Sequence, residues 1–107
     1  MATQGLITVM QDGQVLMKIV AGCHGYKAKA VATSIRKNWP VSIDDAYELA
    51  QKTGFGDEQS LVVISHEGYR AEGVEDLPYS YEETLDNPDF NPRWDSGMCD
   101  YLEIVNI

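Results

Sequence analysis

Residues 6–20, LITVMQDGQVLMKIV, largely determine the architecture expected of this 107-residue chain. Asp12 and Gly13 separate two apolar runs. An Asp-Gly pair in that position favours a two-residue type I′ turn, because glycine takes a positive φ without steric cost. We therefore predict an antiparallel β-hairpin. Its register pairs Gln11 with Gln14, Val9 with Leu16 and Ile7 with Lys18.

Side chains alternate along these two strands, which gives the hairpin two apolar faces. We expect one face to line the core, and this face holds Leu6, Met10, Val15, Met17 and Ile19. The opposite face carries Ile7, Val9, Leu16 and Val20. Two explanations are open for this second face. Either another layer of the protein covers it, or two copies of the chain form a homodimer through the N-terminal hairpin.

After the hairpin the apolar spacing becomes helical. Residues 27–38 carry one apolar stripe, and the residue before Pro40 is pushed out of the helical region, so the helix ends there. Ser42 is the expected N-cap of a second helix that ends at Gly54. The inner stripe of this second helix is predicted to contain Ala46, Leu49, Ala50 and Thr53.

The later elements are shorter. Residues 61–64, LVVI, predict a buried strand, and a turn at 66–68 leads into a weaker strand over 69–72. Residues 80–83 match a capping box and predict a short helix up to Asp86, followed by a loop over 86–97 and a last strand over 101–107. This order predicts a small two-layer α+β domain spanning 1–107. Two helices would cover one face of a mainly antiparallel sheet of four to five strands.

Charge is unevenly distributed along the chain. Residues 1–71 carry seven basic and seven acidic side chains, whereas residues 72–107 carry ten acidic side chains and Arg93 alone, which gives the net charge of −9. An acidic surface of this kind repels phosphate backbones, so we expect no direct binding to nucleic acid. One interpretation of the acidic segment is a solvated rim that keeps the protein soluble.

The sequence also bears on location. No apolar run approaches the ~20 residues that a membrane span requires, and residues 1–4 lack the basic and apolar regions of a secretory signal. We therefore expect a cytoplasmic protein that does not bind membranes. Thiols are reduced in that compartment, so Cys23 and Cys99 are not expected to form a disulfide.

The pair Cys23-His24 lies where a strand is predicted to lead into a helix, between Gly22 and Gly25. Unpaired amides at a helix N-terminus can lower the pKa of a thiol, which would make Cys23 a candidate nucleophile. Adjacent side chains tend to point apart, so His66 is a better candidate base than His24. The alternative interpretation is a glycine-flanked loop whose thiol packs as a small apolar group.

Metal binding is not predicted. The possible ligands show no CxxC or HxxxH spacing, and the oxygen-rich segment 86–91 lacks the central glycine and the final glutamate of an EF-hand loop. No cofactor motif occurs.

The acidic third is also aromatic, and aromatic anchors within a charged rim are typical of protein-recognition surfaces. The candidate partner-binding residues are Tyr79, Tyr81, Glu82, Glu83, Phe90, Trp94 and Asp95. The alternative is that these rings hold a long loop against the sheet.

Two functional hypotheses follow. The first is a small, non-enzymatic domain that binds another protein through its acidic, aromatic C-terminal third. The second is a thiol-dependent enzyme or a redox-responsive domain, with Cys23 as nucleophile and His66 or His24 as base.

Overall fold

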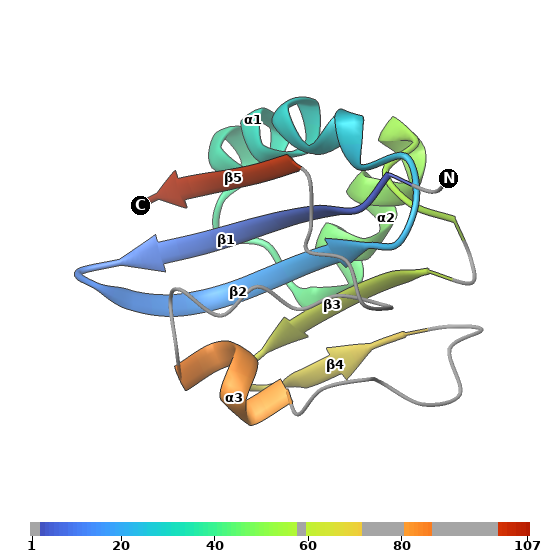
Figure 1. Ribbon diagram of the computed structural model, residues 1–107. Helices are drawn as coiled ribbons and strands as arrows, with labels where there is room; N and C mark the ends of the chain where they lie inside the picture. Colours follow the sequence, from blue (N-terminus) through green and yellow to red (C-terminus); the bar gives the residue numbers. More distant parts are fainter. Residues whose placement is uncertain (1–2, 58–59, 72–80, 87–100) are drawn as a thin grey trace.

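The computed structural model describes residues 3–57, 60–71, 81–86 and 101–107, and these form a small α+β fold (Figure 1). Five strands make one mixed sheet in the order β4-β3-β2-β1-β5. The strands are β1 (Gly5–Gln11), β2 (Gln14–Ala21), β3 (Leu61–Ser65), β4 (Gly68–Arg70) and β5 (Tyr101–Asn106). The helices are a 3₁₀ turn η1 (Gly25–Lys27), α1 (Ala28–Asn38), α2 (Ile43–Thr53) and α3 (Tyr81–Asp86).

The predicted hairpin is confirmed at its turn. Asp12 and Gly13 both have positive φ, 51° and 79°, as a type I′ turn requires, and Gln11 lies opposite Gln14. Beyond the turn, a β-bulge at Leu16 shifts the register by one residue. The predicted pairs Val9–Leu16 and Ile7–Lys18 are therefore wrong. The observed pairs are Val9–Met17, Thr8–Lys18 and Ile7–Ile19.

The bulge also changes which side chains share a face. Val9, Met17 and Ile19 line the main core under α1 and α2 together with Ile7, so the predicted core face combined residues from the two sides. Val15 instead packs on the second face, in a cluster with Val62, Ile64 and Leu85. Leu85 belongs to α3, so part of the chain itself covers the second face of the hairpin. The other polar and apolar side chains buried on that face are Leu6, Thr8, Lys18 and Val20.

The two long helices form as predicted. The Oγ of Ser42 accepts a hydrogen bond from the backbone N–H of Asp45 over 3.0 Å, and Gly54 ends α2 with φ 89°. The buried side of α2 also includes Tyr47, which is fully buried although the predicted inner stripe did not contain it. Its ring lies under the guanidinium of Arg70, whose Cζ is 4.2 Å from the ring centroid.

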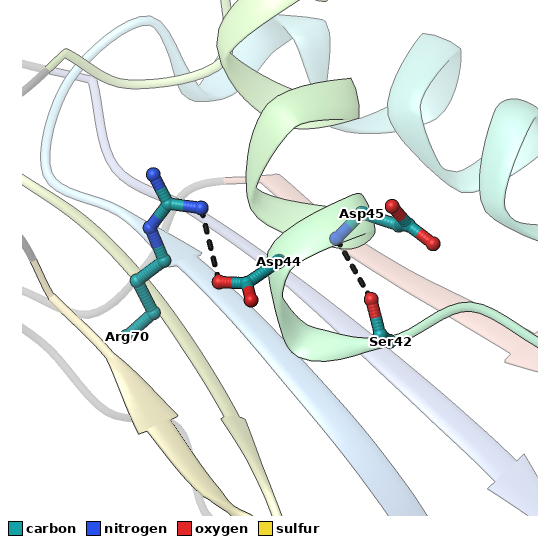
Figure 2. A network of polar contacts seen from close by, with 4 residues as sticks. All are labelled: Ser42, Asp44, Asp45 and Arg70. Carbon is teal, nitrogen blue, oxygen red and sulfur yellow. Dashed lines mark hydrogen bonds and ion pairs between the residues drawn. The ribbon is translucent and has the colours of Figure 1, made fainter.

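Arg70 joins the sheet to α2. Its Nη1 donates to Asp44 Oδ1 over 3.1 Å, in the same helical turn that Ser42 caps (Figure 2). The arginine therefore contacts an aromatic ring and a carboxylate on consecutive turns of one helix. This fixes the short strand β4 against α2.

The last strand differs from the others in direction. β5 pairs parallel with β1, from Gly5 opposite Tyr101 to Met10 opposite Asn106, so the sheet is mixed. α1 packs over β5 and β1 on the core side (Figure 1). Within the described part of the chain, β5 has a strand on one side only and forms one edge of the sheet.

Candidate functional site

Cys23 and His24 lie in the turn after β2, beside the loop that precedes β3. The N–H of Gly22 donates to the carbonyl of Ser60 over 3.0 Å and ties the two segments together. Cys23 Sγ lies 3.5 Å from His24 Nδ1 and 3.4 Å from Ser60 Oγ. The adjacent cysteine and histidine therefore meet, contrary to the expectation that neighbouring side chains point apart. His24 is held in this position with a left-handed backbone, φ 55°.

The electrostatic environment of the thiol favours its protonated form. Burial raises the pKa of Cys23 above its ordinary value, and the hydrogen bond and negative charge of Asp57 raise it further, whereas the hydrogen bond with Ser60 lowers it. Ser60 Oγ in turn donates to Asp57 Oδ1 over 2.9 Å. Burial and the carboxylate of Asp57 therefore oppose the lowering of the thiol pKa that amides at a helix N-terminus could cause.

His66 does not approach Cys23. Cys23 follows the C-terminal end of β2 and His66 follows the C-terminal end of β3, and these strands are antiparallel. The two residues thus lie at opposite ends of the sheet, about 20 Å apart at the usual rise per residue. His66 Nε2 donates instead to the carbonyl of Val15 over 2.8 Å, which joins the turn after β3 to β2. Of the three candidate catalytic residues, only Cys23 and His24 come together.

Most of the candidate partner-binding residues lie outside the described part of the chain. This applies to Tyr79, Phe90, Trp94 and Asp95. Tyr81, Glu82 and Glu83 form the first turn of α3, the helix that covers the second face of the sheet. The recognition surface proposed from these side chains therefore stays a prediction. What the structure does describe in the C-terminal third is α3 and the edge strand β5.

The β5 edge is the most exposed apolar surface among the described residues. Leu102 and Ile104 are 56% and 57% exposed, and Tyr101 and Ile107 are 45% and 41% exposed. Only Val105 is buried, where it packs into the main core. Leu102 and Ile104 lie on one face of the strand and Tyr101 and Ile107 on the other, so both faces of this edge strand expose large apolar side chains. Exposed apolar patches mark interaction sites more often than isolated exposed residues do. We call residues 101–107, with the side that faces away from β1, the β5 edge.

The backbone of β5 adds directional groups to this patch. The N–H of Tyr101 donates to Gln4 and that of Ile107 donates to Met10, over 3.2 and 2.8 Å. Peptide groups alternate sides along a strand, so the odd-numbered residues face β1. Leu102, Ile104 and Asn106 consequently direct their N–H and C=O groups away from β1, to the side of β5 on which the described residues place no strand. The β5 edge therefore offers alternating donors and acceptors next to apolar side chains.

Two hollows near α2 are weaker candidates for a binding site than the β5 edge. One, of about 420 Å³, lies between the end of α1 and the outer side of α2, and the other, of about 280 Å³, lies beside Trp39 and His66. Both are open to solvent, and neither is lined by Cys23 or His24. Over residues 3–57, 60–71, 81–86 and 101–107, no three His, Cys, Asp or Glu side chains gather as a metal site would require. No helix in those ranges has the length and apolar character needed to cross a membrane.

The β5 edge was not identified in the sequence, although a signal was present. In YLEIVNI, residues 101–107, apolar side chains occupy both alternating positions, so both faces of the strand are apolar. A strand of that kind is buried on both faces or exposes one of them.

Comparisons with models of protein families, with curated proteins and with solved structures each gave no significant match.

Proposed function

We propose that this protein is a binding domain rather than an enzyme, and that its C-terminal third docks an extended segment of another polypeptide along the β5 edge. The observation that carries the proposal is that the backbone groups of Leu102, Ile104 and Asn106 face away from β1, where no strand of the described ranges lies, and that exposed apolar side chains lie beside them. Adding a strand to such an edge gives affinity through main-chain hydrogen bonds and specificity through alternate side chains.

The edge strand itself carries one of the features that keep sheet edges from pairing, the inward-pointing charge of Glu103, and lacks several others. Natural edge strands are commonly interrupted by proline, by lysine, by a bulge or by being very short. β5 has six residues without proline or lysine, and its register with β1 is continuous. Its single charged residue, Glu103, lies on the core side of the strand. β4, at the other edge, has only three residues and is protected by its length.

The environment of Cys23 supports the same choice. A thiol whose pKa is raised is a poor nucleophile at neutral pH, and the candidate base His66 lies at the far end of the sheet. The contact between Cys23 and His24 is the one observation that favours a thiol-dependent reaction. The acidic residues, the aromatic residues and the cytoplasmic location predicted from the sequence belong to this proposal as expectations.

A photocrosslinking experiment in cells tests the docking function. A photoreactive residue replaces Leu102 on the β5 edge or, as a control, Tyr69, which is 55% exposed on the opposite edge strand β4. We expect polypeptide adducts from position 102 that are lost when Ile104→Pro is added, and few adducts from position 69. Equal adducts from both positions, or adducts from position 102 that persist with Ile104→Pro, contradict the proposal.

A further inference from the structure

We propose that the β5 edge selects an acidic segment of its partner, in which carboxylate and apolar side chains alternate, and that the carboxylates meet Lys29 and Arg36 of α1. This inference rests on the proposed function of the β5 edge and adds the chemical class of the segment that docks there. A strand added beyond β5 lies about 4.8 Å from it, beside α1. The side of α1 that faces outward therefore determines which side chains the added strand can carry.

The two long helices lie over different parts of the sheet. α1 packs on β5 and β1, whereas α2 packs on β3 and β4 (Figure 1). One flank of α1 thus faces α2, and the opposite flank faces outward beyond β5. Asn38 identifies the flank that faces α2, because it lines a hollow together with Asp45 and Leu49 of that helix.

Lys29 and Arg36 lie on the outer flank of α1. They are seven residues apart, nearly two helical turns, so their side chains leave the helix in similar directions. At about 100° per residue, Asn38 points roughly half a turn away from both of them. Both basic side chains are exposed, and neither forms an ion pair with any residue in the described ranges. Two unneutralised cations therefore lie above the outer side of β5.

Helix stability does not account for Lys29. This residue lies in the first turn of α1, which contains no acidic side chain. A positive charge there opposes the helix dipole, whereas Arg36 in the last turn complements it. An acidic group bound at the outer flank gives both cations a partner and offsets the unfavourable position of Lys29.

The spacing of the two cations is compatible with a docked strand. Seven residues of a helix rise about 10 Å. Side chains on one face of a strand recur about every 6.7 Å, so the next but one lies about 13 Å away, and the long side chains of lysine and arginine span the difference. Side chains on the other face of the docked strand lie beside Leu102 and Ile104, which are 56% and 57% exposed. Apolar side chains fit there, so the edge favours a segment that alternates acidic and apolar residues.

Long-range and local charge act on such a segment in opposite directions. The chain carries a net charge of −9, which repels it. Salt screens exposed charges beyond about 8 Å at physiological ionic strength, so the side chains that touch the segment dominate. The charged side chains of α1 and β5 are Lys29, Arg36, Lys37 and Glu103. Their balance is positive, and Glu103 disfavours a carboxylate directly opposite it.

Docking of defined peptides on the full chain tests the inference. Each peptide has about eight residues and alternates valine with glutamate, glutamine or lysine. A photoreactive residue at position 102 reports docking, and the adduct yield against peptide concentration gives a dissociation constant at about 150 mM salt. We expect the glutamate peptide to dock at least about fivefold more tightly than the glutamine peptide, because each of two exposed ion pairs contributes about twofold or more. The lysine peptide should dock most weakly.

Charge variants test the assigned contacts. Arg36→Glu and Lys52→Glu form a matched pair, since each reverses an exposed charge in the last turn of a helix. Arg36→Glu should weaken docking of the glutamate peptide at least about fivefold, whereas Lys52→Glu on α2 should leave it within about twofold. Lys29→Glu should also weaken docking although it favours the helix dipole, so this loss is not one of folding. Glu103→Gln should tighten docking about twofold.

The outcomes separate the inference from the proposed function. Equal docking of the glutamate and glutamine peptides, or tighter docking of the lysine peptide, overturns the acidic selection and leaves the docking function in place. A preference for glutamate that neither Lys29→Glu nor Arg36→Glu reduces also overturns the inference. If no peptide gives adducts from position 102, the inference is overturned, and the absence of cellular adducts from that position overturns the proposed function as well.

Discussion

The backbone N–H of Ile107 donates to the carbonyl of Met10 over 2.8 Å, and this bond establishes which side of β5 each peptide group faces. Together with the bond from Tyr101 to Gln4, it turns the odd-numbered residues toward β1 and the even-numbered ones outward. Proline substitutions test this alternation directly, because proline removes the backbone N–H at one chosen position.

Val105→Pro should destabilise the protein far more than Ile104→Pro. Val105 faces β1 with its N–H and packs its side chain into the core, so we expect a loss of roughly 3 kcal/mol or more. Ile104→Pro should cost less than about 1 kcal/mol, since its N–H faces outward. Urea unfolding measures both losses. Equal losses would mean that the assigned alternation is incorrect.

Gly25→Ala should be strongly destabilising. A Cβ at Gly25 would collide with the backbone of Gln4 and Gly5, where the chain before β1 passes the turn after β2. Neither backbone can yield without breaking the hydrogen bond from Gly25 to Thr3, so we expect a loss of about 3 kcal/mol, at the upper end of ordinary overpacking.

Gly13→Ala is the control for that substitution. Gly13 has a left-handed backbone conformation, with φ 79°, but a Cβ added there meets no atom within 4 Å. It should cost only the positive-φ penalty of about 1–2 kcal/mol. If thermal or urea unfolding gave the same loss for both variants, steric contact at Gly25 would not be the cause.

Arg70→Lys should destabilise the protein by about 0.5–1 kcal/mol even though it keeps the charge. The planar guanidinium stacks over the buried ring of Tyr47, and lysine cannot reproduce that contact. The ion pair with Asp44 should contribute little, because the Asp44 side chain is 76% exposed. Urea unfolding at low and high salt separates the terms. A loss that disappears at high salt would assign the effect to the ion pair instead.

Thiol labelling of Cys23 should be slow at neutral pH. Burial and Asp57 raise the thiol pKa, so the midpoint of the rate against pH should lie above that of a free cysteine. Asp57→Asn should lower the midpoint and speed labelling at about pH 7.5, the pH range just below an ordinary thiol pKa. Glu48→Gln, an exposed change on α2, should leave the rate unaltered. A Cys99→Ser background restricts the signal to Cys23.

The same shift has a consequence for stability. Because the folded-state pKa of Cys23 is raised, its neutral form is favoured in the folded protein. The associated stability is fully present below the ordinary thiol pKa and is lost as the pH rises through the folded-state value. A midpoint below that of a free cysteine, or stability that grows with pH in this range, would contradict the assigned environment.

The elements that depend on local chemistry were predictable from the sequence. The Asp12-Gly13 turn, the Ser42 cap and the Gly54 terminus each follow from the conformational preferences of the residues involved. The bulge at Leu16 was not predictable, because nothing in the local sequence distinguishes a continuous strand from one that gains a residue. The position of the bulge depends on which side chains can pack against the layers that cover the two faces of the sheet.

Features that join distant segments were also beyond the sequence. The raised pKa of Cys23 depends on Asp57 and Ser60, more than thirty residues away in the chain. Likewise, tertiary packing determines that β5 lies beside β1, and a parallel partner cannot be inferred from the composition of YLEIVNI. The exposure of Leu102 and Ile104 follows from this position, so the candidate edge is identified only in the folded chain.

Residue-resolved amide hydrogen exchange tests the assigned alternation of backbone groups along the β5 edge most directly. At about 10 µM, the amides of Glu103 and Val105 should be protected, whereas those of Leu102, Ile104 and Asn106 should exchange freely. Outward amides that are protected as strongly as those of Glu103 and Val105 would contradict the account.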